Sequence, residues 1–215
     1  MIQLSRRGAV VAGPDEGLEQ LRLQYSRDHF VVIPKIFAQD LIEDVLERFQ
    51  TAPFQSRVHE GVGTELCMED LLIKAMLNCL VNDPRFYRFV QELTGCGHIG
   101  CFNGRVYRMA PGAGHYDSWH DDVRETRLVT MSVNLSPEPY AGGLLQLRET
   151  QSDHILAEIA NTGLGDALLF QISPRLKHRV SPVEGSVPKT AFAGWFQTEP
   201  DFRAMFRDVA VAPDT

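Results

Sequence analysis

The sequence predicts one α+β domain, with helices in its first half and a mainly β, antiparallel core in its second half. Apolar residues recur at helical spacing in the first half, and short β-rich runs separated by turn residues follow from residue 99. No linker, internal repeat or low-complexity tract divides the chain. We expect a single domain over residues 1–215, in which about residues 1–98 form a helical support region and about 99–200 form the core.

The first half has one predicted strand and three predicted helices. The run at residues 29–33 ends before Pro34 and indicates a strand. Asp40 is the expected N-cap of the first helix, and Asp83 with Pro84 is typical of a start with proline at the first helical position. The apolar stripes, interpreted as buried faces rather than a cofactor groove, predict helices over residues 41–49, 71–80 and 86–93.

The segment at residues 54–69 contains Gly61 and Gly63 and has little periodicity. It is either a lid over the mouth of the core, which would open and close around a substrate, or an exposed connector.

The second half consists of short strands with turn signals between them. Strands about ten residues apart favour an antiparallel sandwich or barrel over βαβ units, with the helices packed outside. The predicted strands are residues 105–109, 128–135, 143–147, 154–159, 166–170, 179–183 and 190–196.

Composition excludes several classes of protein. The net charge of −7 argues against a nucleic-acid binder, and no apolar run approaches the roughly 18 residues of a membrane span. The four cysteines form no C-x-x-C pair, so we expect reduced thiols. Arg6-Arg7 is followed by an apolar stretch too short for an export signal, so we expect a cytoplasmic protein.

His120, Asp122 and His178 are candidate metal ligands. Residues i and i+2 of an extended segment share a face, and His178 begins a distant strand that could oppose them. Two imidazoles and one carboxylate form the facial triad typical of non-haem Fe(II) oxygenases. The spacing alone is weak, because chance supplies about one His-x-acid pair in this composition.

A second pair, His115 and Asp117, competes with the first. The two pairs have opposite strand parity, so they are not expected to face one metal together. Spacing does not choose between them.

Several blocks of the second half resemble 2-oxoglutarate/Fe(II) dioxygenases of the prolyl-4-hydroxylase-like group. The blocks, in order, are GAGHYDSWHDD at 112–122, RLVTMSVNLS at 127–136, YAGGLLQL at 140–147, GDALLF at 165–170, HRVSPV at 178–183 and GWF at 194–196. The resemblance covers about residues 102–197. It implies a double-stranded β-helix, a jelly-roll or cupin-like barrel with the N-terminal helices packed outside.

The same resemblance assigns the site residues. Iron would be held by His120, Asp122 and His178, which leaves three coordination positions open for 2-oxoglutarate and O2. The family places a basic residue about ten positions after the second His, and Lys189 stands eleven positions after it. Lys189 would bind the far carboxylate of 2-oxoglutarate, and Tyr107 matches a tyrosine that donates to the same group. The alternatives are a solvated lysine and a core aromatic.

The implied activity is that of a 2-oxoglutarate-dependent non-haem iron dioxygenase, a hydroxylase of a small molecule or amino-acid side chain. Its cofactors would be Fe(II), 2-oxoglutarate and O2, with ascorbate as a further candidate. The carboxylate ligand argues against a halogenase, and Leu144 replaces the acid of the usual G-G-E turn. Asp121, Trp119, His115, Arg124 and Arg127 flank the triad and are candidates for the substrate mouth.

Two other classes of protein stay open. A non-catalytic cupin-like metal- or ligand-binding β-barrel is the first alternative, although the His-x-His start of cupins is missing. A partner-binding domain with incidental histidines is the second. The sequence does not predict the oligomeric state.

Overall fold

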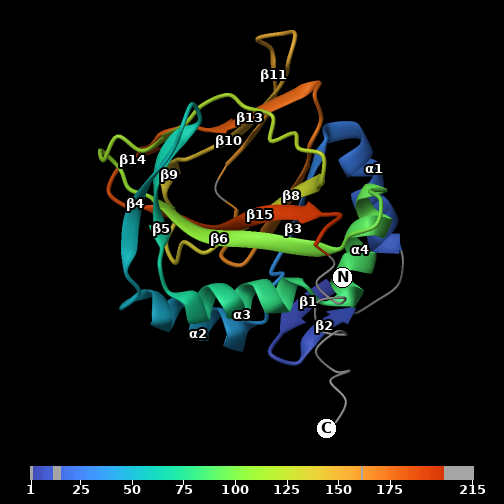
Figure 1. Cartoon of the computed structure of the whole chain (residues 1–215), viewed down its shortest axis with the longest axis horizontal. Coiled ribbons are helices and arrows are strands. Elements are labelled where there is room, and N and C mark those ends of the chain that lie inside the picture. Colours follow the sequence, from blue (N-terminus) through green and yellow to red (C-terminus); the bar gives the residue numbers. More distant parts are fainter. Residues whose placement is uncertain (1, 12–15, 161, 201–215) are drawn as a thin grey trace, which may run out of the picture.

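A curled, eight-stranded antiparallel sheet dominates the fold (Figure 1). The computed structural model describes residues 2–11, 16–160 and 162–200. A three-stranded sheet faces the large sheet, and the helices cover its other side. The predicted mainly β fold with helices outside is therefore confirmed, and its two facing sheets are those of a double-stranded β-helix.

Four helices lie in the described ranges, one more than the sequence predicted. They are α1 (Glu16–Asp28), α2 (Gln39–Phe49), α3 (Leu71–Val81) and α4 (Pro84–Thr94). The side chain of Asp83 accepts a hydrogen bond from the backbone of Arg85 at the start of α4, as predicted. The expectation for Asp40 was wrong: α2 begins two residues earlier, with Ala38 as its N-cap. Asp40 lies in the first turn, where an acid still complements the helix dipole.

The large sheet has the strand order β3-β12-β8-β15-β6-β5-β4, and β7 pairs with β5. Every pairing in it is antiparallel. The bounds are β3 (Phe30–Ile33), β4 (Phe54–His59), β5 (Gly63–Met68), β6 (Cys101–Met109), β7 (Tyr116–Asp117), β8 (Arg127–Asn134), β12 (Ala167–Gln171) and β15 (Lys189–Gln197).

The smaller sheet has the order β11-β10-β13, and β9 pairs with β14 beside it. The single strand predicted over residues 179–183 is two strands, because Pro182 has no N–H to donate to a continuing ladder. The bounds are β9 (Ala141–Gly142), β10 (Leu145–Glu149), β11 (Ile155–Ile159), β13 (Leu176–Val180) and β14 (Val183–Glu184).

Alternation along the strands separates a core from a cavity. On β15, Phe192 and Phe196 are fully buried among the residues that pack against the helices. Lys189 and Trp195, at odd positions of the same strand, face the space between the two sheets. On β15, Lys189 and Trp195 are therefore directed away from the helices and toward the cavity.

The two halves of the chain share one hydrophobic core. Buried residues from Ile2 to Phe196 belong to the same cluster, and strands β3 and β5 of the first half pair with β12 and β6 of the second. The predicted division at about residue 98 therefore does not divide the packing. A short hairpin of β1 (Ile2–Ser5) and β2 (Gly8–Val11), which the sequence did not predict, lies beside α4.

The segment at residues 54–69, for which the sequence left a lid and a connector open, is the regular hairpin β4–β5, which extends the large sheet. Its turn and β5 line the cavity. None of the helices in the described ranges has the length and apolarity needed to cross a membrane.

Candidate active site

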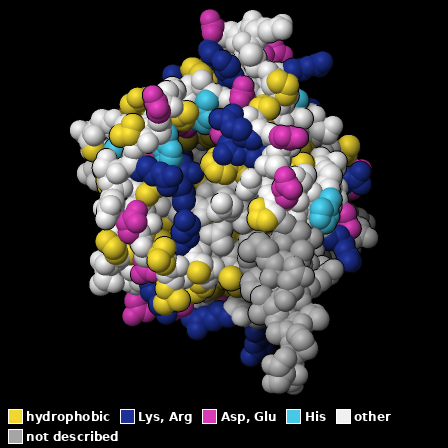
Figure 2. All heavy atoms as spheres, in the orientation of Figure 1, with side chains coloured by type: hydrophobic (Ala, Val, Ile, Leu, Met, Phe, Trp, Pro, Cys, Tyr) yellow, Lys and Arg dark blue, Asp and Glu magenta, His cyan; other side chains and the backbone are white. Residues whose placement is uncertain are grey.

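A cavity of about 370 Å³ lies between the two sheets. Strands β5, β6, β8, β12, β13 and β15 all contribute side chains to its wall. In the view of Figure 2, Lys, Arg and His side chains gather over the β5–β6 side of the molecule.

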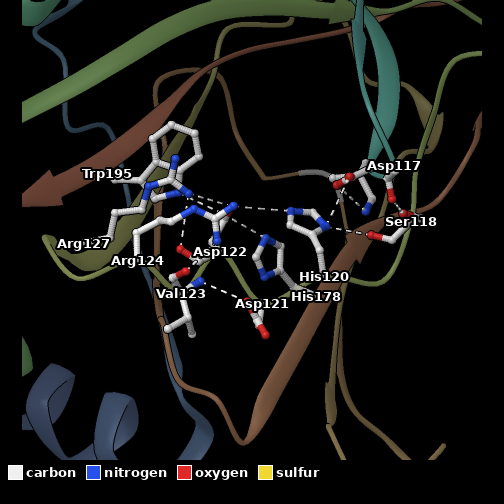
Figure 3. Close-up of polar contacts among 12 residues, drawn as sticks. Asp117, Ser118, His120, Asp121, Asp122, Val123, Arg124, Arg127, His178 and Trp195 are labelled. Atoms are coloured by element: carbon white, nitrogen blue, oxygen red, sulfur yellow. Dashed lines mark hydrogen bonds and ion pairs between the residues drawn. The ribbon is translucent and has the colours of Figure 1, made fainter.

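His120, Asp122 and His178 converge at the wall of this cavity (Figure 3). The Nε2 atom of His178 lies 3.3 Å from Oδ2 of Asp122, and Nε2 of His120 lies 3.7 Å from Oδ1. Their ligand atoms all lie within 4.8 Å of one another. The backbones of His120 and His178 exchange two hydrogen bonds, of 3.0 and 2.8 Å, which bring the two imidazoles together.

Asp122 reaches the histidines from a turn and not from an extended strand. Its φ of 57° is in the left-handed region, which aspartate tolerates better than most residues. The same-face argument for residues i and i+2 therefore predicted the right neighbour for the wrong geometric reason. Trp195 Nε1 donates to Oδ2 of Asp122 at 2.8 Å, and Arg127 donates to Oδ1 at 3.1 Å.

Neighbouring hydrogen bonds keep Asp122 ionised. Burial alone would raise the pKa of its carboxyl, but the hydrogen bonds from His178 and Trp195 and the nearby His120 hold that pKa well below its usual range. Nδ1 of His120 lies 2.7 Å from the carbonyl oxygen of Ser118, so this nitrogen must donate. In neutral His120 the lone pair is then on Nε2, the nitrogen that faces Asp122.

The second candidate pair separates. His115 turns to the backbone, where its Nδ1 accepts a hydrogen bond from the N–H of Ala110. Asp117 instead lines the cavity, 3.5 Å from Nδ1 of His120, and burial raises the pKa of its carboxyl. As predicted, the two pairs do not face one metal together, because the cluster that could hold an ion contains neither His115 nor Asp117. The strand alternation behind that prediction does not apply here, since β7 is only two residues long and does not continue to His120.

Lys189 has the surroundings of a buried anion-binding group. It is 8% exposed, lines the cavity, and donates from Nζ to the carbonyl oxygen of Gly143 at 2.6 Å. Burial lowers the pKa of its ammonium group to about 8. Lys189 forms no ion pair within the described ranges, although Asp117 acts on its charge, so a carboxylate that enters the cavity would supply a direct charge partner.

Tyr107 lines the same cavity from β6, two positions along from the residue that pairs with Lys189. Burial raises the pKa of its phenol far above the usual value, so the hydroxyl is a donor. Lys189 and Tyr107 therefore present two donors to one space.

The other candidates for the substrate mouth fall into two groups, those that line the cavity and those that do not. Arg124 and Arg127 line the cavity, whereas His115, Trp119 and Asp121 are not among its lining residues. Trp119 lies instead against the guanidinium groups of Arg148 and Arg179, at 4.4 and 4.7 Å from its ring centroid.

The cavity residues that were not found from the sequence include His59, Glu65 and Arg105. They come from hairpin β4–β5 and from β6, and no motif marks them. Only the strand register indicates that Glu65 faces the cavity. Cys67 lies opposite Tyr107, a cavity residue, and Glu65 is two positions before Cys67 and so on the same face of β5.

The donor set at the triad fits Fe(II). Two imidazole nitrogens and a carboxylate oxygen on one side of a cavity are the ligands of a facial triad, and they leave the cavity side free. Residues 104–197 match the family model of the 2OG-Fe(II) oxygenase superfamily. The core of this chain belongs to that superfamily. The cofactors of this superfamily, iron and 2-oxoglutarate, agree with the triad and with the cavity.

Solved structures of 2OG oxygenases share the fold over nearly the whole chain. A 2OG-Fe(II) oxygenase family oxidoreductase from Burkholderia pseudomallei is 14% identical, with a TM-score of 0.63 over 93% of this chain and 97% of the other. A Trichoplax adhaerens prolyl hydroxylase, solved with a hypoxia inducible factor peptide, is 16% identical, with a TM-score of 0.64 over 93% and 94%. The epimerase SnoN from nogalamycin biosynthesis is 14% identical, with a TM-score of 0.61 over 94% and 93%.

No curated protein sequence matches the chain. The predicted superfamily is thus confirmed by the match over the core, and the structural neighbours confirm the predicted fold.

Proposed function

We propose that this 2OG-Fe(II) oxygenase is a dioxygenase that hydroxylates a C–H bond of a small molecule or an amino-acid side chain, with decarboxylation of 2-oxoglutarate to succinate. In this proposal His120, Asp122 and His178 bind the iron, and Lys189 and Tyr107 bind 2-oxoglutarate. The observation that carries it is the convergence of two imidazoles and one carboxylate beside a cavity that also holds a buried lysine.

Iron and 2-oxoglutarate, when bound, supply the oxidation, and the chain supplies geometry and a dry site. The Ser118 carbonyl fixes the tautomer of His120, and Trp195 and Arg127 fix the orientation of Asp122. Lys189 would bind the far carboxylate through a charge-assisted hydrogen bond. The cavity wall also carries the apolar side chains of Leu145, Leu168, Phe170 and Val180, which exclude water from the reacting groups.

Replacing a proposed ligand tests the triad. Asp122→Ala and His178→Ala should each abolish succinate release from 2-oxoglutarate and the stoichiometric binding of Fe(II), measured separately by metal analysis. His115→Ala is the matched control, because this histidine belongs to the competing pair and is bonded to the backbone. Near-normal iron content and succinate release in either ligand variant would exclude this triad.

Product analysis separates hydroxylation from the outcome named for SnoN, which is an epimerase. A hydroxylase adds one oxygen atom to its substrate for each succinate released, whereas an epimerase leaves the substrate mass unchanged. An unchanged mass with stoichiometric succinate would contradict hydroxylation and leave the iron site in place.

A further inference from the structure

A second cluster of charged side chains lines the cavity outside the triad. Glu65 of β5 accepts a hydrogen bond from Nε of Arg105 at 2.6 Å, and its Oε1 also lies 2.9 Å from Nε2 of His59. Sγ of Cys67 donates to the same oxygen at 3.2 Å. Glu65, Arg105 and His59 all line the cavity, and nothing proposed above uses them.

The contacts of Glu65 all involve one of its two oxygens. Oε2 has no hydrogen-bond partner in the described part of the chain. It is not fully buried, so a ligand can reach it. Glu65 is only 7% exposed and is one of the residues that line the cavity, so Oε2 is the oxygen that it can offer to a ligand there. Burial alone would raise the pKa of this carboxyl, but Arg105, His59 and Cys67 hold it below the usual value, so Glu65 is ionised.

Arg105 is also only partly used. Within the described residues its Nε is hydrogen-bonded and its two terminal nitrogens are not. The guanidinium lies 5.8 Å from the ring centroids of both Tyr107 and Trp195. Trp195 in turn contacts Asp122 at 2.8 Å, so a group bound by Arg105 would lie one side chain away from the proposed iron ligands.

A metal ion is not the ligand that this cluster fits. His59, Glu65 and Cys67 are close enough to hold one, but the guanidinium of Arg105 already occupies the shared oxygen Oε1. The pKa of the Cys67 thiol is raised, first by burial and then by Glu65, so a thiolate ligand is disfavoured. The site therefore offers a carboxylate oxygen beside guanidinium donors.

We infer that the substrate of the proposed oxygenase is a free α-amino acid, whose carboxylate binds Arg105 and whose ammonium group binds Oε2 of Glu65. The inference rests on the proposed function and names its substrate class. A zwitterionic head group is complementary to this pair, because it carries a negative charge that can meet Arg105 next to a positive charge that can meet Glu65. The cavity volume of about 370 Å³ is at the small end of the range of small-molecule sites, and it must also admit 2-oxoglutarate.

Binding to the loaded, inert enzyme tests this inference directly. The full chain is loaded with Mn(II) and 2-oxoglutarate, and the twenty common free L-amino acids are titrated by calorimetry. The amino acid that binds most tightly is then compared with its analogue lacking the ammonium group, its analogue lacking the carboxylate, and its N-acetyl amide. Each analogue should bind at least about tenfold more weakly, since each lacks a charge-assisted contact.

Two outcomes would overturn the inference and leave the proposed function standing. One is that Mn(II) and 2-oxoglutarate bind but no free amino acid does. The other is that the blocked amide binds as tightly as the zwitterion. Failure of Mn(II) and 2-oxoglutarate to bind would instead overturn the proposed function, and the inference with it.

Single substitutions assign the two charges. Arg105→Met should weaken binding of the amino acid at least about tenfold but leave binding of the analogue without a carboxylate nearly unchanged. Glu65→Gln should also weaken binding of the amino acid at least about tenfold but leave binding of the analogue without an ammonium group nearly unchanged. Arg88→Met and Glu92→Gln, exposed on α4, are the matched controls. An equal loss for all probes in both cavity variants would mean that the ion pair only shapes the wall, which contradicts the inference.

Discussion

The buried charge of Lys189 predicts how tightly 2-oxoglutarate binds and how this affinity depends on pH. Among the residues that the structure describes, its buried ammonium group has one hydrogen-bond partner, the carbonyl oxygen of Gly143, and the centroid of the Tyr140 ring is 5.6 Å away. Burial disfavours the charged form more than the nearby Asp117 favours it, which is why the pKa falls from 10.5 to about 8. A bound dianion would restore the charged form, so binding of 2-oxoglutarate and protonation of Lys189 should be coupled.

We expect Lys189→Met to weaken 2-oxoglutarate binding by at least about tenfold, measured by calorimetry on the Mn(II)-loaded protein. The affinity of the unmodified protein should fall as the pH rises above about 8, because the free lysine then loses its proton. Lys189→Arg should bind with little fall between pH 7 and 9, since a guanidinium stays charged. A flat profile in the unmodified protein, with no loss in Lys189→Met, would move the anchor elsewhere.

The stability of the ligand-free protein should change with pH in the opposite direction to the affinity for 2-oxoglutarate. The unfolded chain binds the lysine proton up to about pH 10.5, whereas the folded chain releases it near 8. The free energy of unfolding of the ligand-free protein should therefore rise with pH between these values.

At the scale of elements, Asp83 joins two parts of the first half. One oxygen of its carboxylate accepts from the backbone of Arg85 and begins α4, and the other accepts from the N–H of Ala9 in β2 at 2.9 Å. Asp70 performs only the first of these roles, at the start of α3. Asp83 also forms an exposed ion pair with the side chain of Arg85, at 2.7 Å, so the difference between the two aspartates measures the Ala9 contact together with this ion pair.

Asp83→Ala should lower the free energy of unfolding by about 2 kcal/mol, and Asp70→Ala by about 1 kcal/mol, measured by urea denaturation. Burial tends to raise the pKa of Asp83, but the hydrogen bonds from Arg85 and Ala9 lower it to about 2. The contribution of Asp83 is therefore complete above its ordinary pKa of 3.8 and is lost as the pH falls through about 2. Equal costs for the two substitutions would show that the Ala9 contact contributes nothing.

Hairpin β4–β5 shows where element prediction from sequence failed. Its burial does not alternate along β4, where four consecutive residues are exposed, so no period-2 apolar pattern marks it. The hairpin is stable because β5 pairs with β6 and because Glu65 contacts Arg105, which are both contacts with residues about forty positions away. Helices α3 and α4, by contrast, carry local caps and apolar stripes, and their predictions were confirmed.

For the whole molecule, the shared core predicts that both halves unfold together. Phe196 of β15 is fully buried against Phe86 and Tyr87 of α4 and Phe102 of β6. Phe196→Ala should cost about 3–5 kcal/mol. Near-UV and far-UV circular dichroism should still report one coincident transition. Two separate transitions would mean that residues 1–98 and 99–200 are independent units.

Ligand binding should stabilise the same cooperative unit. Mn(II) together with 2-oxoglutarate, each at about 100 times its dissociation constant, should add about 3 kcal/mol or more to the free energy of unfolding. For a chain of this size this corresponds to a rise in Tm of roughly 5–10 °C. Asp122→Ala should show no rise with Mn(II). An unchanged Tm in the unmodified protein would favour the alternative in which the histidines are incidental.

The sequence by itself determined most strands of the core, the start of α4 and the three residues that converge beside the cavity, because each depends on local patterns or on short motifs in a fixed order. Only the tertiary structure decided that Asp122 reaches the histidines through a left-handed turn, that Asp117 faces the cavity, and that Glu65 and Arg105 form a pair beside Trp195. The physical reason is that these features depend on register and chain direction between segments distant in sequence. Residue types and their spacing along the sequence do not specify the register or the chain direction of such segments.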